Sequence, residues 1–263
     1  MNINIIWGVL APKLNSTSFT FSNIKNILGL SGFDRTILSE LQQNHTDSGK
    51  PTSSKANLIE AVDKELKNWA YNNKKHFLNI LTEEIIKNNP DIEEELQSHL
   101  ERLGWQFYKK QVIPIEILDI SELSEMNESS HRDLIKASIR FRDGDLSGAV
   151  TSISSAVESV TNDIYEKFNL GESKNSSFQE KCNKSIKAVD FMDKLETLSD
   201  IGWDQAEIKP LQQNLKGSLN QFAYVVQSLR NKMSDAHGTK EVLKPLVFDA
   251  IKFAQIIIRI LSK

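Results

Sequence analysis

Apolar residues that recur at the helical period fill the second half of the chain, and they restrict its fold more than any other feature. Between Leu243 and Leu261 they follow spacings of three and four residues without a miss, which is the pattern of a helix with one broad buried face. The same spacing runs through Leu146–Phe168 and Gly217–Gly238. Such helices bury their stripes against one another, so we expect a bundle of about four or five helices here.

Amphipathic helices are also expected in the first half, followed by a small β-hairpin. The helical stripes lie in Ser54–Ala70, Phe77–Ile86 and Asp91–Leu103. In Trp105–Ile117, two short β-rich runs flank a polar tip that contains Lys109 and Lys110, which predicts a hairpin. Helices followed by a hairpin resemble a winged-helix module, whose wing tip would bring these two lysines to a nucleic-acid phosphate. The fold class is therefore mainly α, with an N-terminal helical module and a C-terminal helical bundle.

Two segments are less regular. Ile5 and its neighbours could form a short strand, and Pro12 would interrupt that apolar run. Gly202–Pro210 contains turn-forming residues, so we expect a connector there, with the next helix beginning after it.

The polar segment Ser121–Ser130 marks the expected domain boundary, which gives an N-terminal domain of residues 1–125 and a C-terminal domain of residues 126–263. The first holds 13 Lys/Arg and 17 Asp/Glu, a net charge of -4, and the second holds 19 and 18, a net charge of +1. Neither is a polycation, so bulk charge alone does not drive nucleic-acid binding. The N-terminal domain fits a sensing, regulatory or substrate-selecting role.

The sequence indicates a cytoplasmic protein. Cys182 is the single cysteine, which excludes a disulfide framework and fits a reducing compartment. Met1–Leu10 lacks the basic region and the long apolar core of a signal peptide, and no segment has the length and apolarity of a membrane span. The histidines do not show metal-ligand spacing, so we expect no metal and no other cofactor.

Two polar residues interrupt the apolar stripe of Gly217–Gly238. At ~100° per residue, Arg230 lies only ~20° from Leu219 around the helix and His237 lies at ~0°. A buried arginine is costly unless it is paired, and departures from local rules concentrate at functional sites. One interpretation is an ordinary helix end, with cations at the negative end of the dipole and a glycine cap. The other interpretation is that the side chains of Arg230 and His237 bind the same anion.

Arginine and histidine together suit phosphate chemistry. A guanidinium binds phosphate through two parallel hydrogen bonds, and an imidazole titrates near neutral pH. Histidine could take the proton from a 2′-hydroxyl or give one to the leaving oxygen. Arginine could stabilise the charge that develops on the phosphoryl oxygens.

The segment LRNKMSDAHG, Leu229–Gly238, resembles the signature of the abortive-infection C-terminal domain, which belongs to the HEPN superfamily. That superfamily has an Arg-x(4 to 6)-His motif with a polar residue after the arginine. Here Arg230, Asn231 and His237 match it. The likeness covers about residues 131–263, and it also includes Gly144-Asp145, Gly148-Ala149, Ser154–Val160 and the apolar final helix.

The resemblance implies a HEPN-like bundle that acts as a metal-independent endoribonuclease and leaves a 2′,3′-cyclic phosphate. It implies a homodimer through the C-terminal domain, with both motifs at the interface. It also implies a role in bacterial phage defence or in a toxin–antitoxin system, with single-stranded or tRNA-like RNA as the substrate. An antitoxin or another defence protein would be the partner.

The expected roles of the site residues follow from this resemblance. His237 would be the acid or base, Arg230 would clamp the phosphate, and Asn231 would orient one of them. Ser234 and Asp235 are candidates for positioning groups, and Lys232 is a candidate RNA contact. The apolar face of this helix would depend on a second chain for its burial.

Three further expectations frame the alternatives. Glu158 lies beside the stripe of its helix, where it would be a solvated or structural carboxylate. A non-catalytic HEPN-like module would bind a protein or nucleic acid without cutting it. A DNA-binding regulator would act through the N-terminal domain, although the acidity of residues 1–125 weakens that hypothesis.

Overall fold

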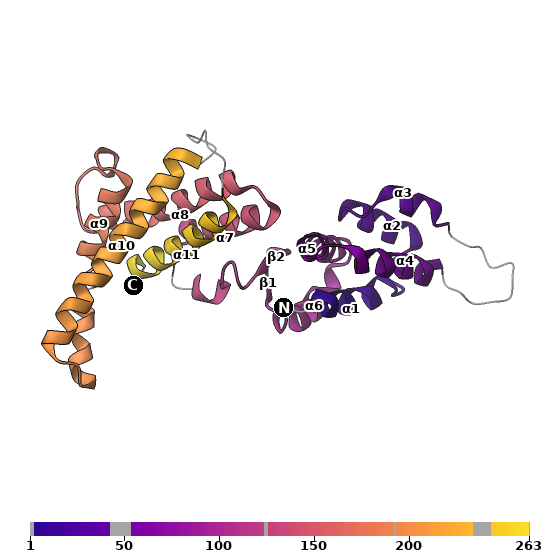
Figure 1. Cartoon of the computed structure of the whole chain (residues 1–263), viewed down its shortest axis with the longest axis horizontal. Coiled ribbons are helices and arrows are strands. Elements are labelled where there is room, and N and C mark those ends of the chain that lie inside the picture. The colour runs from indigo at the N-terminus through magenta and orange to yellow at the C-terminus, as the bar shows by residue number, and fades with distance from the viewer. Residues whose placement is uncertain (1–2, 43–53, 124–125, 192, 234–242, 263) are drawn as a thin grey trace. The chain divides into compact units, whose positions relative to one another are not determined.

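The chain is mainly helical, with one small two-stranded antiparallel sheet, as predicted (Figure 1). The computed structural model describes residues 3–42, 54–123, 126–191, 193–233 and 243–262. It divides into two compact units, Met1–Ile115 and Glu116–Lys263. The division therefore precedes the predicted one at 125/126. The intervening segment is not a bare linker, because Leu118 and Leu123 are fully buried.

The first unit contains six α-helices, one short 3₁₀-helix and the hairpin among its described residues. Its elements are α1 (Ile3–Leu14), α2 (Phe21–Leu30), α3 (Arg35–Glu40), α4 (Ser54–Asn68), α5 (Tyr71–Asn88), η1 (Pro90–Ile92), α6 (Glu93–Glu101), β1 (Trp105–Tyr108) and β2 (Gln111–Pro114). Helix α5 contacts α1, α2 and β2. Its Phe77 ring packs edge-on against Trp69, with the ring centroids 5.3 Å apart, so the core lies around this helix.

The first segment of the chain is a helix and not a strand. In α1, Ile6, Leu10 and Leu14 recur every four residues and are fully buried, which is the helical period. Pro12 lies in the last turn, where the missing N–H removes one hydrogen bond and the residues that follow need not continue the helix. Burial of the stripe therefore outweighs the local effect of the proline.

The hairpin has the predicted position, and its turn has an unusual backbone. Trp105 pairs with Pro114 and Tyr108 with Gln111, so Lys109 and Lys110 form a two-residue turn. Their φ angles are 48° and 67°. Two consecutive positive φ angles define a type I′ turn, which favours Asn-Gly. For residues with a β-carbon, this left-handed conformation costs roughly 1–2 kcal/mol each.

Replacing this turn by Asn-Gly should stabilise the first unit. The double variant Lys109→Asn, Lys110→Gly is expected to raise the free energy of unfolding by about 1–2 kcal/mol, because both new residues tolerate the left-handed region. Thermal unfolding followed by circular dichroism measures the change. The control is Lys109→Ala, Lys110→Ala, which removes the same charges but keeps both β-carbons. An equal gain in the alanine variant would show that charge repulsion, and not backbone strain, is the cause.

The second unit is a helical bundle. Its elements are η2 (Ile120–Leu123), α7 (Glu128–Asp143), α8 (Leu146–Lys167), η3 (Ser173–Asn175), α9 (Phe178–Ala188), η4 (Asp193–Ile201), α10 (Gln205–Met233) and α11 (Lys244–Leu261). Helix α8 contacts α7, α9, α10 and α11, and it buries side chains around most of its circumference. A helix with so much buried surface lies at the centre of a bundle.

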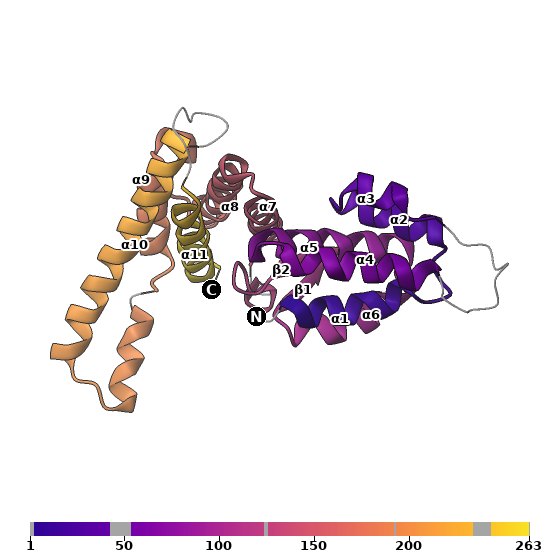
Figure 2. The same ribbon diagram turned by 45° about the vertical axis from the view of Figure 1, so that its right-hand side comes forward.

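Helix α10 is longer than predicted. It begins at Gln205, so the expected connector Gly202–Pro210 is largely helical, with Pro210 in the second turn. Ile208 is fully buried before the proline, and this packing holds the first turns in place although proline removes one backbone hydrogen bond. Figure 2 shows the first half of α10 extending past the other helices of its unit, with the η4 segment beside it.

Two glycines in helices of this unit should respond oppositely to alanine. At Gly148 a β-carbon would lie 2.2 Å from Asp145 Oδ2 and 2.5 Å from Arg140 Nη1. Asp145 caps α8 through the Gly148 N–H at 2.9 Å, so Gly148→Ala should displace the cap and lose about 1 kcal/mol of stability. At Gly217 nothing lies within 4 Å of a β-carbon. Gly217→Ala should gain up to ~1 kcal/mol.

Chemical denaturation of both variants measures this contrast. A gain for Gly148→Ala as large as that for Gly217→Ala would show that the cap and Arg140 rearrange without cost.

Candidate functional site

The apolar stripe of α10 exists as predicted, but it is buried within its own chain. Leu219, Ala223 and Val226 are fully buried, and α10 contacts α8, α9 and α11. The ring of Phe222 stacks on Phe253 of α11, with centroids 4.2 Å apart and an interplanar angle of 6°. The expectation that this stripe needs a second chain for its burial is therefore wrong, because helices α8, α9 and α11 of the same unit cover it.

Arg230 lies next to this stripe and is paired. Its Nη1 donates a hydrogen bond to Glu158 Oε1 at 2.6 Å, which joins α10 to α8. The arginine side chain is 29% exposed and the glutamate side chain 28%. The carboxylate compensates the charge that the sequence places beside apolar residues, and solvent still reaches the guanidinium. This combination distinguishes Arg230 from a fully buried structural arginine.

Glu158 also faces a second cation. Lys181 Nζ of α9 lies 3.8 Å from the same Oε1 atom. The Glu158 carboxylate of α8 therefore links α9 and α10 through two cations. Of the two roles that the sequence left open for Glu158, the structural one fits this geometry. Sequence reasoning could not find the pairing, since helical spacing places Glu158 beside a stripe but does not say which helix faces it.

The last turn of α10 carries the other described candidates. Asn231 and Lys232 are exposed. Ser147 Oγ, at the start of α8, donates a hydrogen bond to the Met233 carbonyl at 2.7 Å. This bond fixes the end of the helix beside the start of α8. Ser234, Asp235 and His237 lie outside the described residues, so the geometry between Arg230 and His237 stays a prediction.

Cys182 of α9 lies close to Glu158 and Lys181 and is fully buried. Burial raises the pKa of its thiol to about 12, and the charge of Glu158 adds to the rise. The thiolate is the nucleophilic form, so a thiol with this pKa is inert at neutral pH. The thiol therefore has a packing role.

The thiol should react only after unfolding. At pH 8, the native protein is expected to resist alkylation by iodoacetamide, and protein in denaturant should be modified fully, as mass spectrometry would record. Because burial raises the native pKa, the unfolded chain ionises first as pH rises. This group should therefore lower stability progressively above its ordinary pKa and up to about pH 12. Rapid labelling of the native protein would contradict the burial.

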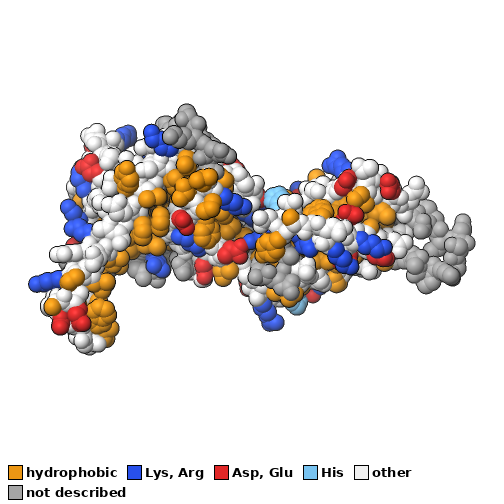
Figure 3. Space-filling model, in the orientation of Figure 1, with side chains coloured by type: hydrophobic (Ala, Val, Ile, Leu, Met, Phe, Trp, Pro, Cys, Tyr) orange, Lys and Arg blue, Asp and Glu red, His pale blue; other side chains and the backbone are white. Residues whose placement is uncertain are grey.

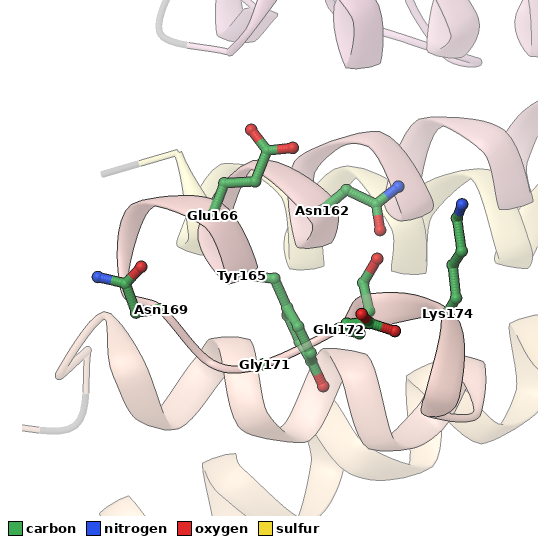
Figure 4. A pocket seen from close by; sticks show the side chains of 8 residues that line it. Asn162, Tyr165, Glu166, Asn169, Gly171, Glu172 and Lys174 are labelled. Atoms are coloured by element: carbon green, nitrogen blue, oxygen red, sulfur yellow. The ribbon is translucent and has the colours of Figure 1, made fainter.

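A cavity of about 550 Å³ opens where α8 ends (Figure 4). It is lined by Asn162, Tyr165, Glu166, Asn169, Gly171, Glu172, Ser173 and Lys174. The buried Tyr165 hydroxyl hydrogen-bonds to Ser176 Oγ at 3.3 Å, which ties the following loop to the helix. Two carboxylates and one ammonium group line this cavity, and the C-terminus of α8 adds its negative dipole end. A polyanion is therefore disfavoured there.

The charge of each unit changes when the observed division replaces the predicted one. Met1–Ile115 holds 13 Lys/Arg and 13 Asp/Glu, a net charge of zero, and Glu116–Lys263 holds 19 and 22, a net charge of -3. The acidity assigned to the N-terminal domain came from residues 116–125. It therefore gives no argument against nucleic-acid binding by the first unit, whose exposed Lys109 and Lys110 form the hairpin tip.

The part of the chain that the structure describes contains no cluster of three or more His, Cys, Asp or Glu side chains that could hold a metal ion. None of its described helices is both long and apolar enough to cross a membrane. Comparison with protein-family models, with curated proteins and with solved structures gives no match.

Proposed function

We propose that the second unit is a HEPN-like endoribonuclease that cleaves RNA without a metal ion, with Arg230 and His237 as its acting groups. Arg230 carries the proposal. Its side chain is held by a carboxylate 2.6 Å away and is still 29% exposed, so it is both fixed and accessible. The resemblance of Leu229–Gly238 to the abortive-infection signature and the helical bundle around α8 support the same assignment.

The proposed reaction is an internal transfer at phosphorus. His237 takes the proton of the 2′-hydroxyl, the 2′-oxygen attacks phosphorus, and the bond to the 5′-oxygen breaks. An imidazolium gives the departing oxygen its proton, so the products are a 2′,3′-cyclic phosphate and a 5′-hydroxyl. Arg230 binds the non-bridging oxygens and stabilises the charge that grows on them. Asn231 orients the phosphate or the imidazole.

The test is cleavage of single-stranded RNA and of tRNA in EDTA, with the product ends identified. The Arg230→Ala and His237→Ala variants should lose activity, and the matched controls Arg132→Ala and His99→Ala should keep it. Arg132 and His99 are exposed and lie on α7 and α6. Unchanged activity in both site variants would exclude this site.

A homodimer would complete the site, because two copies would place two arginines and two histidines around one phosphate. Exposed apolar side chains support this part of the proposal. Tyr224 of α10 is 52% exposed and Leu246 of α11 is 39% exposed, and Figure 3 shows hydrophobic side chains gathered on this unit. Light scattering during gel filtration measures the mass. A monomer at the concentration of the cleavage assay would contradict the composite site.

The biological role would be growth arrest during phage infection or in a toxin–antitoxin pair, with an antitoxin or another defence protein as the restraining partner. Expression in bacteria should slow growth, and His237→Ala should relieve that effect. Equal toxicity of the variant would separate growth arrest from RNA cleavage.

The second candidate is a non-catalytic HEPN-like module, and the Arg230–Glu158 ion pair is the observation that favours it. A carboxylate that neutralises the guanidinium competes with a phosphate for the same donors. This candidate predicts a stable complex with a protein or nucleic acid and no cyclic-phosphate ends under any condition. The cleavage assay in EDTA therefore separates the two candidates.

A further inference from the structure

A second cavity, of about 430 Å³, lies between α9 and α10. The two helices run side by side in both ribbon views (Figures 1 and 2). The cavity is lined by Asn183 and Lys187 of α9 and by Gln213, Lys216, Gly217 and Asn220 of α10. Two ammonium groups and three amides face it, and none of these lining residues has a carboxylate. This is the reverse of the acidic cavity at the end of α8.

Two of the three amides that line the cavity, those of Asn183 and Asn220, are hydrogen-bonded to each other. Asn220 Oδ1 accepts hydrogen bonds from Asn183 Nδ2 at 2.7 Å and from Gln179 Nε2 at 2.8 Å. A carbonyl oxygen accepts about two hydrogen bonds, so the remaining polar group of Asn220 is its NH₂, which is a donor. Asn220 therefore presents a donor to a ligand in the cavity.

The two lysines are not neutralised by neighbours. Lys184 pairs with Glu180 and Lys181 approaches Glu158. Lys187 and Lys216 are exposed, and neither side-chain ammonium group makes an ion pair or hydrogen bond with another described residue. In a unit with a net charge of -3, two such ammonium groups on one cavity mark a local site for an anion. Phosphate suits lysines and amide donors.

The cavity and Arg230 lie along the same helix. Lys216 precedes Arg230 by 14 residues, which corresponds to about 21 Å of rise and about 40° of rotation. A strand whose reacting phosphate lies at Arg230 would reach this cavity several nucleotides away. Proteins that track single strands use such spaced backbone contacts.

We propose that the cavity between α9 and α10 binds a backbone phosphate of single-stranded RNA, several nucleotides from the phosphate held by Arg230. The inference rests on the proposed function and names its substrate class: a single strand long enough to span both positions. The shared ligand chemistry is phosphate, so the experiment must separate an RNA strand from a small phosphate compound.

The experiment measures binding of fluorescent 2′-O-methyl RNA, which cannot be cleaved, to the full chain. Lys187→Glu, Lys216→Glu should weaken binding of a dodecamer by tenfold or more. The slope of log affinity against log salt should fall by about 0.7 for each lost phosphate contact. Binding of a dinucleotide should not change. The control, Lys136→Glu, Lys174→Glu, makes the same charge change on α7 and on η3.

The outcomes are distinct. An equal loss in the control would show that bulk charge drives binding and would overturn the proposal. No loss in Lys187→Glu, Lys216→Glu would also overturn it, because these lysines would then not contact the RNA. Competition by inorganic phosphate or a mononucleotide as strong as that by the dodecamer would assign the cavity to a small phosphate compound instead. If binding of the dodecamer depends on the two lysines but unmodified RNA is not cleaved, the phosphate site in the cavity is supported and the proposed endoribonuclease activity is rejected.

Discussion

Substituting lysine for Arg230 is expected to lower the rate of RNA cleavage by about 10²- to 10³-fold, which is the usual effect of losing one aligned donor from a transition-state clamp. Lysine keeps the positive charge and can still pair with Glu158, so the stability of the bundle should change little. It lacks the planar fork that binds two phosphate oxygens at once. The measurement is a single-turnover rate on labelled RNA in EDTA.

The matched control is Arg132→Lys, because Arg132 is an exposed arginine on α7 that donates a long hydrogen bond of 3.5 Å from Nη2 to Ser129 Oγ. Its variant should cleave at the rate of the unmodified protein. A wild-type rate for Arg230→Lys would mean that the guanidinium contributes only charge, and the proposed clamp would be rejected.

Local sequence patterns predicted most of the helices because the helical period is a local property. Helices α4 (Ser54–Asn68) and α8 (Leu146–Lys167) lie within the predicted stripes Ser54–Ala70 and Leu146–Phe168. The hairpin followed from two β-rich runs around a polar pair. Each of these features depends on residues that are close in sequence, so tertiary contacts were not needed to predict them.

Predictions were wrong where tertiary packing outweighed a local signal. Pro12 was expected to interrupt a short apolar run and Pro210 to end a connector, yet both lie inside helices whose apolar stripes are buried. The chain divides at 115/116 and not at 125/126, and Leu118 and Leu123 in between are fully buried. A short run of apolar residues does not reveal which unit it packs against.

The candidate site was predicted in part. The helical spacing placed Arg230 within the apolar stripe, where a charge was expected to need a partner. It could not name Glu158, which precedes Arg230 by 72 residues. It also assigned the burial of the stripe to a second chain, because spacing along one helix does not say whether the covering helix belongs to the same chain. The cavity between α9 and α10 joins residues of two helices, so no single stretch indicates it.

The Arg230–Glu158 pair has two separable consequences, one for stability and one for catalysis. Glu158→Ala leaves Arg230 and Lys181 without their shared carboxylate beside an apolar seam, which should cost about 1–3 kcal/mol of stability. The double variant Arg230→Ala, Glu158→Ala removes the guanidinium as well. Its cost should be smaller than the sum of the single variants by about 1 kcal/mol.

Glu158→Gln tests whether the carboxylate positions Arg230 for catalysis. Glutamine keeps the volume and one acceptor oxygen, so the fold should persist while the hold on the guanidinium weakens. If Glu158 fixes the clamp, kcat falls and KM changes little. If it competes with phosphate instead, KM falls because the guanidinium becomes more accessible. The control is Glu166→Gln, which changes an exposed glutamate on the same helix and should alter neither kcat nor KM. A coupling energy near zero between Arg230 and Glu158 would reject both the positioning and the competing role of Glu158.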